Sequence, residues 1–326
     1  MRRDTRPRNL KPGVVAILVL LITIAVGADR LHADVTIDLG RGPVTVHVPP
    51  TYDPSQPAPL VMLLHGFTLS GQLQENYFQL LPWSDQLGFL YVFPDGTTDP
   101  DGNKFWNATD ACCDFYDSGI DDSQYLRDLI DEIIQELNVD TERIFLLGHS
   151  NGGFMAYRMA CDHADIIAGV ATLAGATYVD STQCTPSKPL RTLQIHGTVD
   201  ELVEYEGGLV FGDGGPYPGA VETTEQWATL NGCSLSPDLS LPPVDLVSTL
   251  PGFETTIARY TEGCDPGGFS ELWTMVQGNH MPVLSLDFNL LVLDFFFSDE
   301  DGGGLLTYRH FLPAAANAAG AEGSFF

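Results

Sequence analysis

The stretch that most constrains the fold is residues 143–160, RIFLLGHSNGGFMAYRMA. Residues 144–147 form a short apolar run that predicts a buried strand, and residues 154–160 have helical spacing. Between them, GHSNG at 148–152 matches the G-x-S-x-G pattern, in which a sharp strand-to-helix turn exposes a serine hydroxyl above a sheet. Glycines flank the serine because side chains there would collide with the neighbouring strand and helix. Ser150 is therefore the candidate nucleophile.

The N-terminus predicts a segment that is removed from the mature protein. Four arginines and Lys11 precede an apolar run at residues 14–26, and small residues follow, with cleavage expected after Ala28 or Ala33. This pattern is typical of a secretory signal peptide and is too short for a comfortable membrane span. An uncleaved anchor is the alternative. We expect a signal peptide at residues 1–33 and export to an extracellular or periplasmic location.

The rest of the chain alternates apolar, strand-like runs with helical segments. Expected strands are 60–64, 89–93, 144–147, 166–174, 192–196 and 272–276; expected helices are 77–86, 123–137, 222–230 and 286–297. Asp122 or Ser123 is the expected cap of helix 123–137. Such alternation specifies an α/β fold with a mostly parallel central sheet and helices on both faces. Residues 35–39 and 44–48 predict an edge hairpin, and residues 244–260 predict two strands. We expect one catalytic domain, residues 34–297, followed by a loosely ordered tail, residues 298–326.

The chain is strongly acidic, with a net charge of −28 and only three lysines. Loss of residues 1–33 removes six basic and two acidic residues, so the mature charge is about −32. Nucleic acid and anionic membranes are poor partners for such a surface. An acidic, lysine-poor surface favours solubility at high salt, where self-repulsion is screened, so a saline habitat is one hypothesis.

Six cysteines in an exported chain predict disulfides. Proximity in sequence favours Cys161–Cys184 and Cys233–Cys264. Cys112 and Cys113 then either bond to each other or remain free thiols. No paired C-x-x-C pattern occurs, so we expect no metal site.

Cleavage of an ester by serine needs a base that takes the hydroxyl proton and an acid that orients the base. Asp200 follows the expected strand 192–196, and His280 follows the expected strand 272–276. Their order after Ser150 is the order of the α/β-hydrolase fold, in which each residue follows a strand. Glu201 and Glu204 are alternative acids on the same loop. This chemistry requires no cofactor.

An oxyanion hole needs two preorganised backbone N–H groups. We expect one from Asn151, directly after the nucleophile, and the other from Phe67, with Thr68 as second choice, in the loop after strand 60–64. Residues 97–119 form a long irregular loop, and loops of this length are usually functional. Trp106 in that loop and Tyr205 after Asp200 are the expected substrate-binding side chains, with ordinary packing as the alternative.

Several segments together resemble a known family. They are LVMLLHGF (60–67), GFLYVFPDG (88–96), FWNATDACCDFYDSGIDDSQYLRDLID (105–131), RIFLLGHSNGGFMAYRMAC (143–161), LQIHGTVDELVEYEGG (193–208) and GNH (278–280). The chain is similar to secreted α/β-hydrolase esterases grouped with polyhydroxybutyrate depolymerases and feruloyl esterases. The resemblance implies that Ser150, Asp200 and His280 are nucleophile, acid and base. Two departures, the missing tryptophan after His280 and VEY in place of Val-Pro-Tyr at 203–205, lie where substrate would touch.

These observations predict a serine carboxylic ester hydrolase that forms an acyl-enzyme. Expected substrates are feruloyl or acetyl esters of polysaccharides, or hydroxyalkanoate-type polyesters. We expect a monomer with no cofactor, no nucleic-acid partner and no membrane contact once processed. The alternatives are a serine peptidase of the same fold and a non-catalytic binding protein on a hydrolase scaffold.

Overall fold

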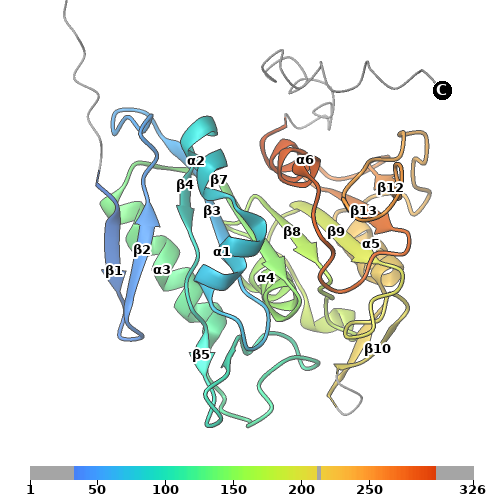
Figure 1. The fold of residues 1–326 in the computed structure, drawn as a ribbon, viewed down its shortest axis with the longest axis horizontal. Helices are drawn as coiled ribbons and strands as arrows, with labels where there is room; N and C mark the ends of the chain where they lie inside the picture. The colour runs from blue at the N-terminus through green and yellow to red at the C-terminus, as the bar shows by residue number, and fades with distance from the viewer. Residues whose placement is uncertain (1–32, 211–213, 299–326) are drawn as a thin grey trace, which may run out of the picture. The chain divides into compact units, whose positions relative to one another are not determined.

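The computed structural model describes residues 33–210 and 214–298 (Figure 1). All but the last residue of the expected signal peptide and all but the first residue of the expected tail lie outside these ranges. No helix in the described ranges is long and apolar enough to cross a membrane.

The core of the protein is a nine-stranded sheet with the strand order β1-β2-β4-β3-β7-β8-β9-β13-β12. Its parallel strands are β3 (Ala58–Leu64), β4 (Leu90–Val92), β7 (Val139–His149), β8 (Gly169–Leu173), β9 (Arg191–Gly197) and β13 (Phe269–Met275). Antiparallel strands flank them: β1 (Val35–Asp38) and β2 (Pro43–His47) at one edge, and β12 (Thr255–Tyr260) at the other. The predicted α/β fold and its edge hairpin are confirmed.

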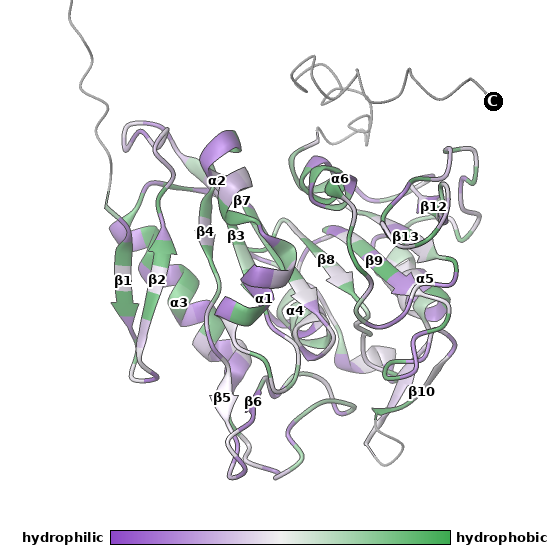
Figure 2. Ribbon diagram, viewed as in Figure 1, coloured by the Kyte–Doolittle hydropathy of each residue, from purple (hydrophilic) through white to green (hydrophobic). Residues whose placement is uncertain are grey.

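Helices cover both faces of this sheet, because its central strands are apolar on both sides (Figure 2). On β3, Leu60, Met62 and Leu64 belong to one buried cluster, whereas Val61 and Leu63 belong to the other. The first cluster packs against α3 (Asp122–Glu136), α4 (Asn151–Asp162) and α5 (Ala220–Leu230). The second packs against α1 (Gly71–Phe78), α2 (Leu81–Leu87) and α6 (Leu286–Phe297).

Short elements lie outside the main sheet. They are the pair β5 (Thr97–Thr98) and β6 (Lys104–Phe105), the pair β10 (Gly207–Leu209) and β11 (Pro216–Pro218), and the 3₁₀ turn η1 (Ser181–Gln183).

Three local expectations need correction. The predicted helix 77–86 is two helices, because Gln79 is left-handed (φ 56°) and the Glu75 carboxylate accepts the N–H groups of Leu80 and Leu81, starting α2. Helix α3 is capped by Asp121, which accepts the Gln124 N–H, rather than by Asp122 or Ser123.

The third correction concerns residues 244–260, which form one strand instead of two. The Glu254 carboxylate accepts the N–H groups of Leu246 and Val247, so these amides are satisfied without a ladder. Of the predicted first strand, two isolated bridges remain, from Val244 to Thr255 and from Val247 to Leu284.

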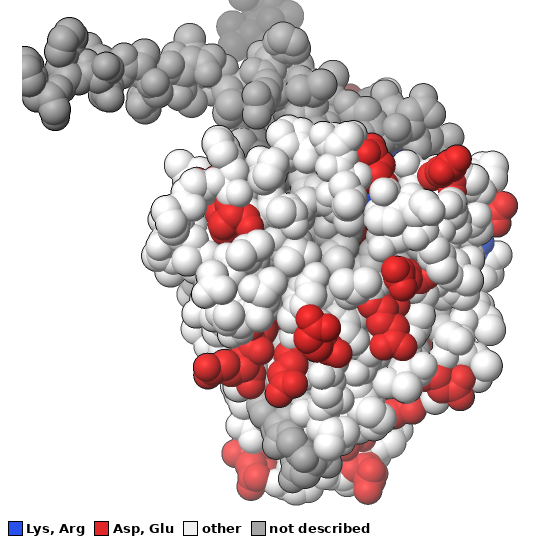
Figure 3. All heavy atoms as spheres, turned by 90° about the vertical axis from the view of Figure 1, so that its right-hand side faces the viewer, with Lys and Arg blue, Asp and Glu red and all other residues white. Residues whose placement is uncertain are grey.

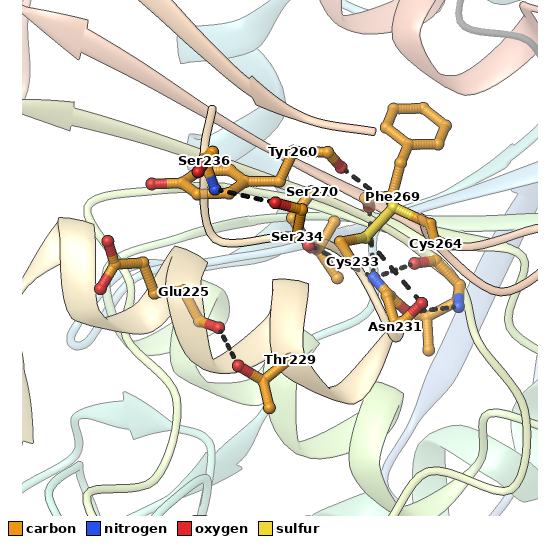
Figure 4. The surroundings of a disulfide bond; sticks show 12 residues. Glu225, Thr229, Asn231, Cys233, Ser234, Ser236, Tyr260, Cys264, Phe269 and Ser270 are labelled. Atoms are coloured by element: carbon orange, nitrogen blue, oxygen red, sulfur yellow. Dashed lines mark hydrogen bonds between the residues drawn. A yellow bond between two sulfur atoms is a disulfide. The ribbon is translucent and has the colours of Figure 1, made fainter. Parts of the chain in front are cut away.

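All six cysteines lie in the described ranges and are paired as Cys112–Cys113, Cys161–Cys184 and Cys233–Cys264. The two predicted bonds are confirmed, and the open alternative at Cys112 is settled as a bond between neighbours. Figure 4 shows Cys233–Cys264, which joins the segment after α5 to the turn after β12, beside Asn231. Figure 3 shows that acidic side chains far outnumber basic ones on the face it draws.

Candidate active site

Ser150 occupies the sharp turn between β7 and α4, with φ 53° and ψ −122°. This backbone conformation is rare for a residue with a side chain and is characteristic of functional turns. A Cβ on Gly152 would lie 2.1 Å from the Leu64 oxygen, and a Cβ on Gly148 would lie 2.1 Å from the Gly152 oxygen. The two glycines are therefore required by packing, and the Ser150 N–H anchors the turn by donating to the Leu173 oxygen at 2.8 Å.

The structure brings Asp200 and His280 together. His280 Nδ1 lies 2.8 Å from Asp200 Oδ2, and Asp200 Oδ1 accepts the N–H groups of Leu202 and Val203, each at 2.9 Å. Burial alone would raise the pKa of Asp200, but hydrogen bonds from His196 and His280 outweigh it and hold that pKa far below its usual range. Asp200 is thus an ionised carboxylate that accepts a hydrogen bond from the Nδ1–H of His280.

Glu201 and Glu204, the alternative acids, are both exposed. Among the described contacts, Asp200 is the carboxylate that pairs with His280. The geometry therefore favours Asp200 over its two neighbours.

His149 connects the turn that carries Ser150 to the loop that carries His280. Its Nε2 lies 3.1 Å from the His280 carbonyl oxygen, and the two rings are 5.0 Å apart. Burial, followed by the neighbouring His280, lowers the pKa of His149 to about 3. A neutral His149 with its proton on Nε2 is consistent with donation to that carbonyl.

The three predicted catalytic residues follow the carboxyl ends of parallel strands. Ser150 comes after β7, Asp200 after β9 and His280 after β13, and ligand sites form at this edge of parallel sheets.

The loop after β3 is held in place by two buried side chains. The Gly66 N–H donates to Gln74 Oε1 at 2.9 Å, and Gln74 is fully buried in α1. His65 Nε2 accepts the Gly96 N–H at 2.8 Å, so His65 Nδ1 carries the proton and donates to the Gly66 oxygen. Burial lowers the pKa of His65, in keeping with this neutral form. Sequence reasoning assigned no role to Gln74.

The two expected oxyanion donors lie next to elements that restrict their movement. Asn151 is the first residue of α4, whose initial N–H groups have no partner within the helix. The N–H of Thr68, the second choice for the other donor, already donates to the Lys104 oxygen at 2.8 Å. This bond argues against Thr68, and the assignment of Phe67 as the donor from the β3 loop stays a prediction.

Trp106 supports this region from the interior of the protein. The Asn151 side-chain amide accepts the Trp106 N–H at 2.7 Å and donates to the Trp106 oxygen at 2.9 Å, while the indole N–H donates to the His65 oxygen. Trp106 is 0% exposed. The expectation that Trp106 contacts substrate is therefore corrected: its ring is buried in the core next to the loop after β3.

Tyr205 contacts β9 and β13, the strands that precede Asp200 and His280. Its hydroxyl is 2.8 Å from Thr274 Oγ1, and its ring meets the His196 ring edge to face at 5.7 Å. The side chain is half-buried, so contact between Tyr205 and substrate remains a prediction.

Asp122 anchors the long loop that begins at Thr97. Its buried carboxylate accepts the Asn107 N–H at 2.6 Å and the Thr97 hydroxyl at 3.0 Å, and it pairs with Arg41. The Asp-Asp pair at 121–122 was part of the resemblance, but its division into a helix cap and a loop anchor was not predicted.

A cavity of about 350 Å³ lies against this loop. Asn107, the Cys112–Cys113 disulfide and Phe115 are among its lining residues. The ring of Phe115 meets that of Phe67 edge to face at 5.4 Å, which puts one wall of the cavity beside the expected oxyanion loop.

Comparison with known proteins agrees with this architecture. Residues 51–211 match the phospholipase/carboxylesterase family profile. The chain is 33% identical to feruloyl esterase B of Piromyces equi over 205 residues, which is 61% of this chain and 37% of that protein. It is 24% identical to poly(3-hydroxyalkanoate) depolymerase C of Paucimonas lemoignei over 267 residues, 74% of this chain and 61% of that protein.

This chain has the α/β-hydrolase fold and is similar to esterases. A solved acetyl xylan esterase from Aspergillus awamori superposes with a TM-score of 0.57 at 16% identity, covering 81% of this chain and 99% of that one, which supports the fold. This chain spans only 37% of feruloyl esterase B and 22% of the bifunctional acetylxylan esterase/xylanase XynS20E of Neocallimastix patriciarum. The latter is 28% identical over 163 residues, or 50% of this chain.

Proposed function

We propose that this protein hydrolyses carboxylic esters through a covalent acyl-serine intermediate. The observation that carries the proposal is the 2.8 Å contact between His280 Nδ1 and Asp200 Oδ2 at the sheet edge that also carries the strained Ser150 turn. Acyl transfer requires a histidine base that a carboxylate orients, together with a serine nucleophile on a sharp strand-to-helix turn.

In the first half-reaction, Ser150 Oγ attacks the acyl carbon while His280 Nε2 takes the hydroxyl proton. Asp200 holds the imidazole with its proton on Nδ1 and stabilises the imidazolium that forms. The N–H groups of Phe67 and Asn151 stabilise the negative oxygen, and the N-terminal end of α4 adds a favourable dipole. His280 then protonates the leaving alcohol, and the acyl group remains on Ser150.

In the second half-reaction, water attacks the acyl-serine and gives its proton to His280. Collapse of the second tetrahedral intermediate releases the acid and returns the proton to Ser150 Oγ. Apart from the substrate and water, the proposed cycle uses only the side chains and backbone amides named here.

The proposed substrates are feruloyl or acetyl esters of polysaccharides, or hydroxyalkanoate-type polyesters. The similarity to feruloyl esterase B, at 33% identity, supports the first class, and the similarity to poly(3-hydroxyalkanoate) depolymerase C, at 24% identity, supports the second. Methyl ferulate, acetylated xylan, hydroxybutyrate oligomers and polymer film, assayed side by side, will separate them.

The reaction itself is tested with p-nitrophenyl butyrate and the matching p-nitroanilide. Wild-type protein should cleave the ester, and Ser150→Ala should lower kcat by a factor on the order of 10⁴ or more. A fluorophosphonate should label the wild type but not the variant. Preference for the anilide would indicate a peptidase, and an inert, unlabelled wild type would indicate a binding protein.

We further propose that the mature protein is exported and monomeric. Three disulfides support an oxidising compartment. N-terminal sequencing of secreted protein should begin at residue 29 or 34, and sedimentation should give the mass of a single chain. A chain retained with an intact N-terminus, or a stable dimer, would contradict this.

A further inference from the structure

Besides His280, a second histidine contacts the loop that carries Asp200. This residue is His196, near the end of β9. His196 is 1% exposed, and its Nε2 lies 2.7 Å from the Val203 carbonyl oxygen. The same nitrogen lies 3.4 Å from Asp200 Oδ2, the oxygen that faces His280. Both backbone polar groups of Val203 are therefore hydrogen-bonded, because its N–H donates to Asp200 Oδ1.

The tautomer of His196 follows from its other neighbour, Gln194. The Gln194 side-chain nitrogen donates to the Gly175 carbonyl at 2.8 Å, which fixes the orientation of the amide, since a carbonyl can only accept. Its remaining N–H is directed at His196 Nδ1, 3.0 Å away, so Nδ1 accepts. The proton of His196 must then be on Nε2, where Val203 and Asp200 receive it.

Gln194 is in turn held by groups from α4 and from β8, the strand next to β9. Its Oε1 accepts the hydroxyls of Tyr157 at 2.8 Å and Thr172 at 2.6 Å. Tyr157 belongs to α4, the helix that starts directly after Ser150, and both Tyr157 and Thr172 are almost fully buried. The hydrogen-bond chain therefore runs from the nucleophile's helix to the acid's loop.

We propose that His196 is a positioning residue for Asp200, and that the buried chain Tyr157–Gln194–His196 sets its Nε2–H tautomer. The proposal rests on the esterase function argued above. Without the Nε2–H, the 200–203 loop loses the donor to Val203 and Asp200 Oδ2 loses one of its two facing N–H groups. His280 is then oriented less well, and misplacement by about 1 Å costs on the order of 100-fold in rate.

Two His196 variants separate the hydrogen bond from the shape of the side chain. His196→Phe keeps a ring but removes both nitrogens, whereas His196→Gln returns an N–H near the Nε2 position. We expect His196→Phe to lower kcat on p-nitrophenyl butyrate between about 10-fold and 100-fold with little change in KM. His196→Gln should recover most of this loss.

The matched control is Thr192→Val on the same strand. Thr192 is 2% exposed and its hydroxyl bonds to Ser270 Oγ at 2.8 Å, so the variant also loses a buried hydrogen bond, but one that does not reach Asp200. It should lower Tm without lowering kcat. If His196→Phe does not fold, Gln194→Met breaks the chain one step earlier and should lower kcat by a smaller factor.

Three results would overturn the proposal: kcat of His196→Phe within twofold of wild type, His196→Gln no better than His196→Phe, or an equal loss in Thr192→Val. The low-field proton NMR signal of the His280 Nδ1–H, bonded to Asp200, provides a readout that does not need turnover. It should shift or broaden in His196→Phe but not in Thr192→Val. If the wild type hydrolyses no ester, the function fails while this signal still decides the role of His196.

Discussion

The two sides of the candidate site are held by different kinds of contact. The Ser150 turn is defined by backbone packing: glycines at 148 and 152 allow main chains to approach, and the Ser150 N–H bonds to a neighbouring strand. The Asp200 and His280 loops also meet through backbone, since the Val199 N–H donates to the Gly278 oxygen at 3.0 Å. They depend on side chains as well, with His196, Asp200 and His280 in one hydrogen-bonded group. Backbone packing tolerates almost no added atom, whereas a side-chain network can be weakened one donor at a time.

We call the Ser150 turn the backbone half of the site and the Asp200 and His280 loops its side-chain half. The largest expected loss of kcat comes from a change in the side-chain half. Asp200→Asn keeps the shape but presents an amide to His280 and favours the wrong tautomer, so kcat should fall by a factor on the order of 10⁴. Glu204→Gln, on the same loop and exposed, should stay within twofold. Steady-state kinetics on p-nitrophenyl butyrate measure both, and equal losses in the two variants would contradict the assignment of Asp200.

The backbone half should respond to a single methyl group. Gly152→Ala places a Cβ 2.1 Å from the Leu64 oxygen, so the turn must shift, and kcat should fall on the order of 100-fold together with Tm. Gly208→Ala is the control, because its Cβ meets only the ends of the Glu204 and Tyr217 side chains, each at 3.3 Å. Full activity in Gly152→Ala would show that the turn is less constrained than its packing indicates.

Gln74 tests whether the backbone half also depends on one side chain. Gln74→Met removes the acceptor of the Gly66 N–H, which should loosen the oxyanion loop and lower kcat about tenfold with KM nearly unchanged. Gln72→Met removes an exposed amide from the same helix and should have no effect. If the two variants behave alike, Gln74 does not position the loop.

The smallest effect concerns His149, the contact between the two halves. Its pKa of about 3 means that the unfolded chain binds a proton below pH 6.5 while the folded chain does not, so stability decreases as pH falls through that window. The slope from this residue should rise from about half of the one-proton value at pH 6.5 toward that full value, about 1.4 kcal/mol per pH unit, below about pH 5.5. Urea unfolding of His149→Gln should give a correspondingly flatter profile.

Other groups do not obscure that comparison. The pKa of Asp200 is lowered, so its contribution is lost only below the unfolded value of about 4. Burial, followed by Glu271, raises the pKa of Asp294 to about 6, which gives an opposite slope in wild type and variant alike. Identical pH profiles for the two proteins would mean that His149 titrates normally.

The sequence by itself determined the features that depend on near neighbours along the chain. The strand–turn–helix at Ser150 was predictable because its glycines and apolar runs are local, and α6 (Leu286–Phe297) was predicted with its observed ends. The parallel sheet followed from the alternation of apolar strands and helices, and Cys161–Cys184 and Cys233–Cys264 from proximity in sequence. Even the order of Ser150, Asp200 and His280 required no contact information.

Tertiary structure decided which side chains meet across the sheet. Trp106 was expected to contact substrate but is buried, because its backbone pairs with the Asn151 side chain, 45 residues away. Gln74 and His196 carried no sequence signal of their own, since each acts through a partner brought near only by folding. Local propensity depends on a few neighbouring residues, whereas these hydrogen bonds depend on how separate strands and loops pack, and packing is a property of the whole fold.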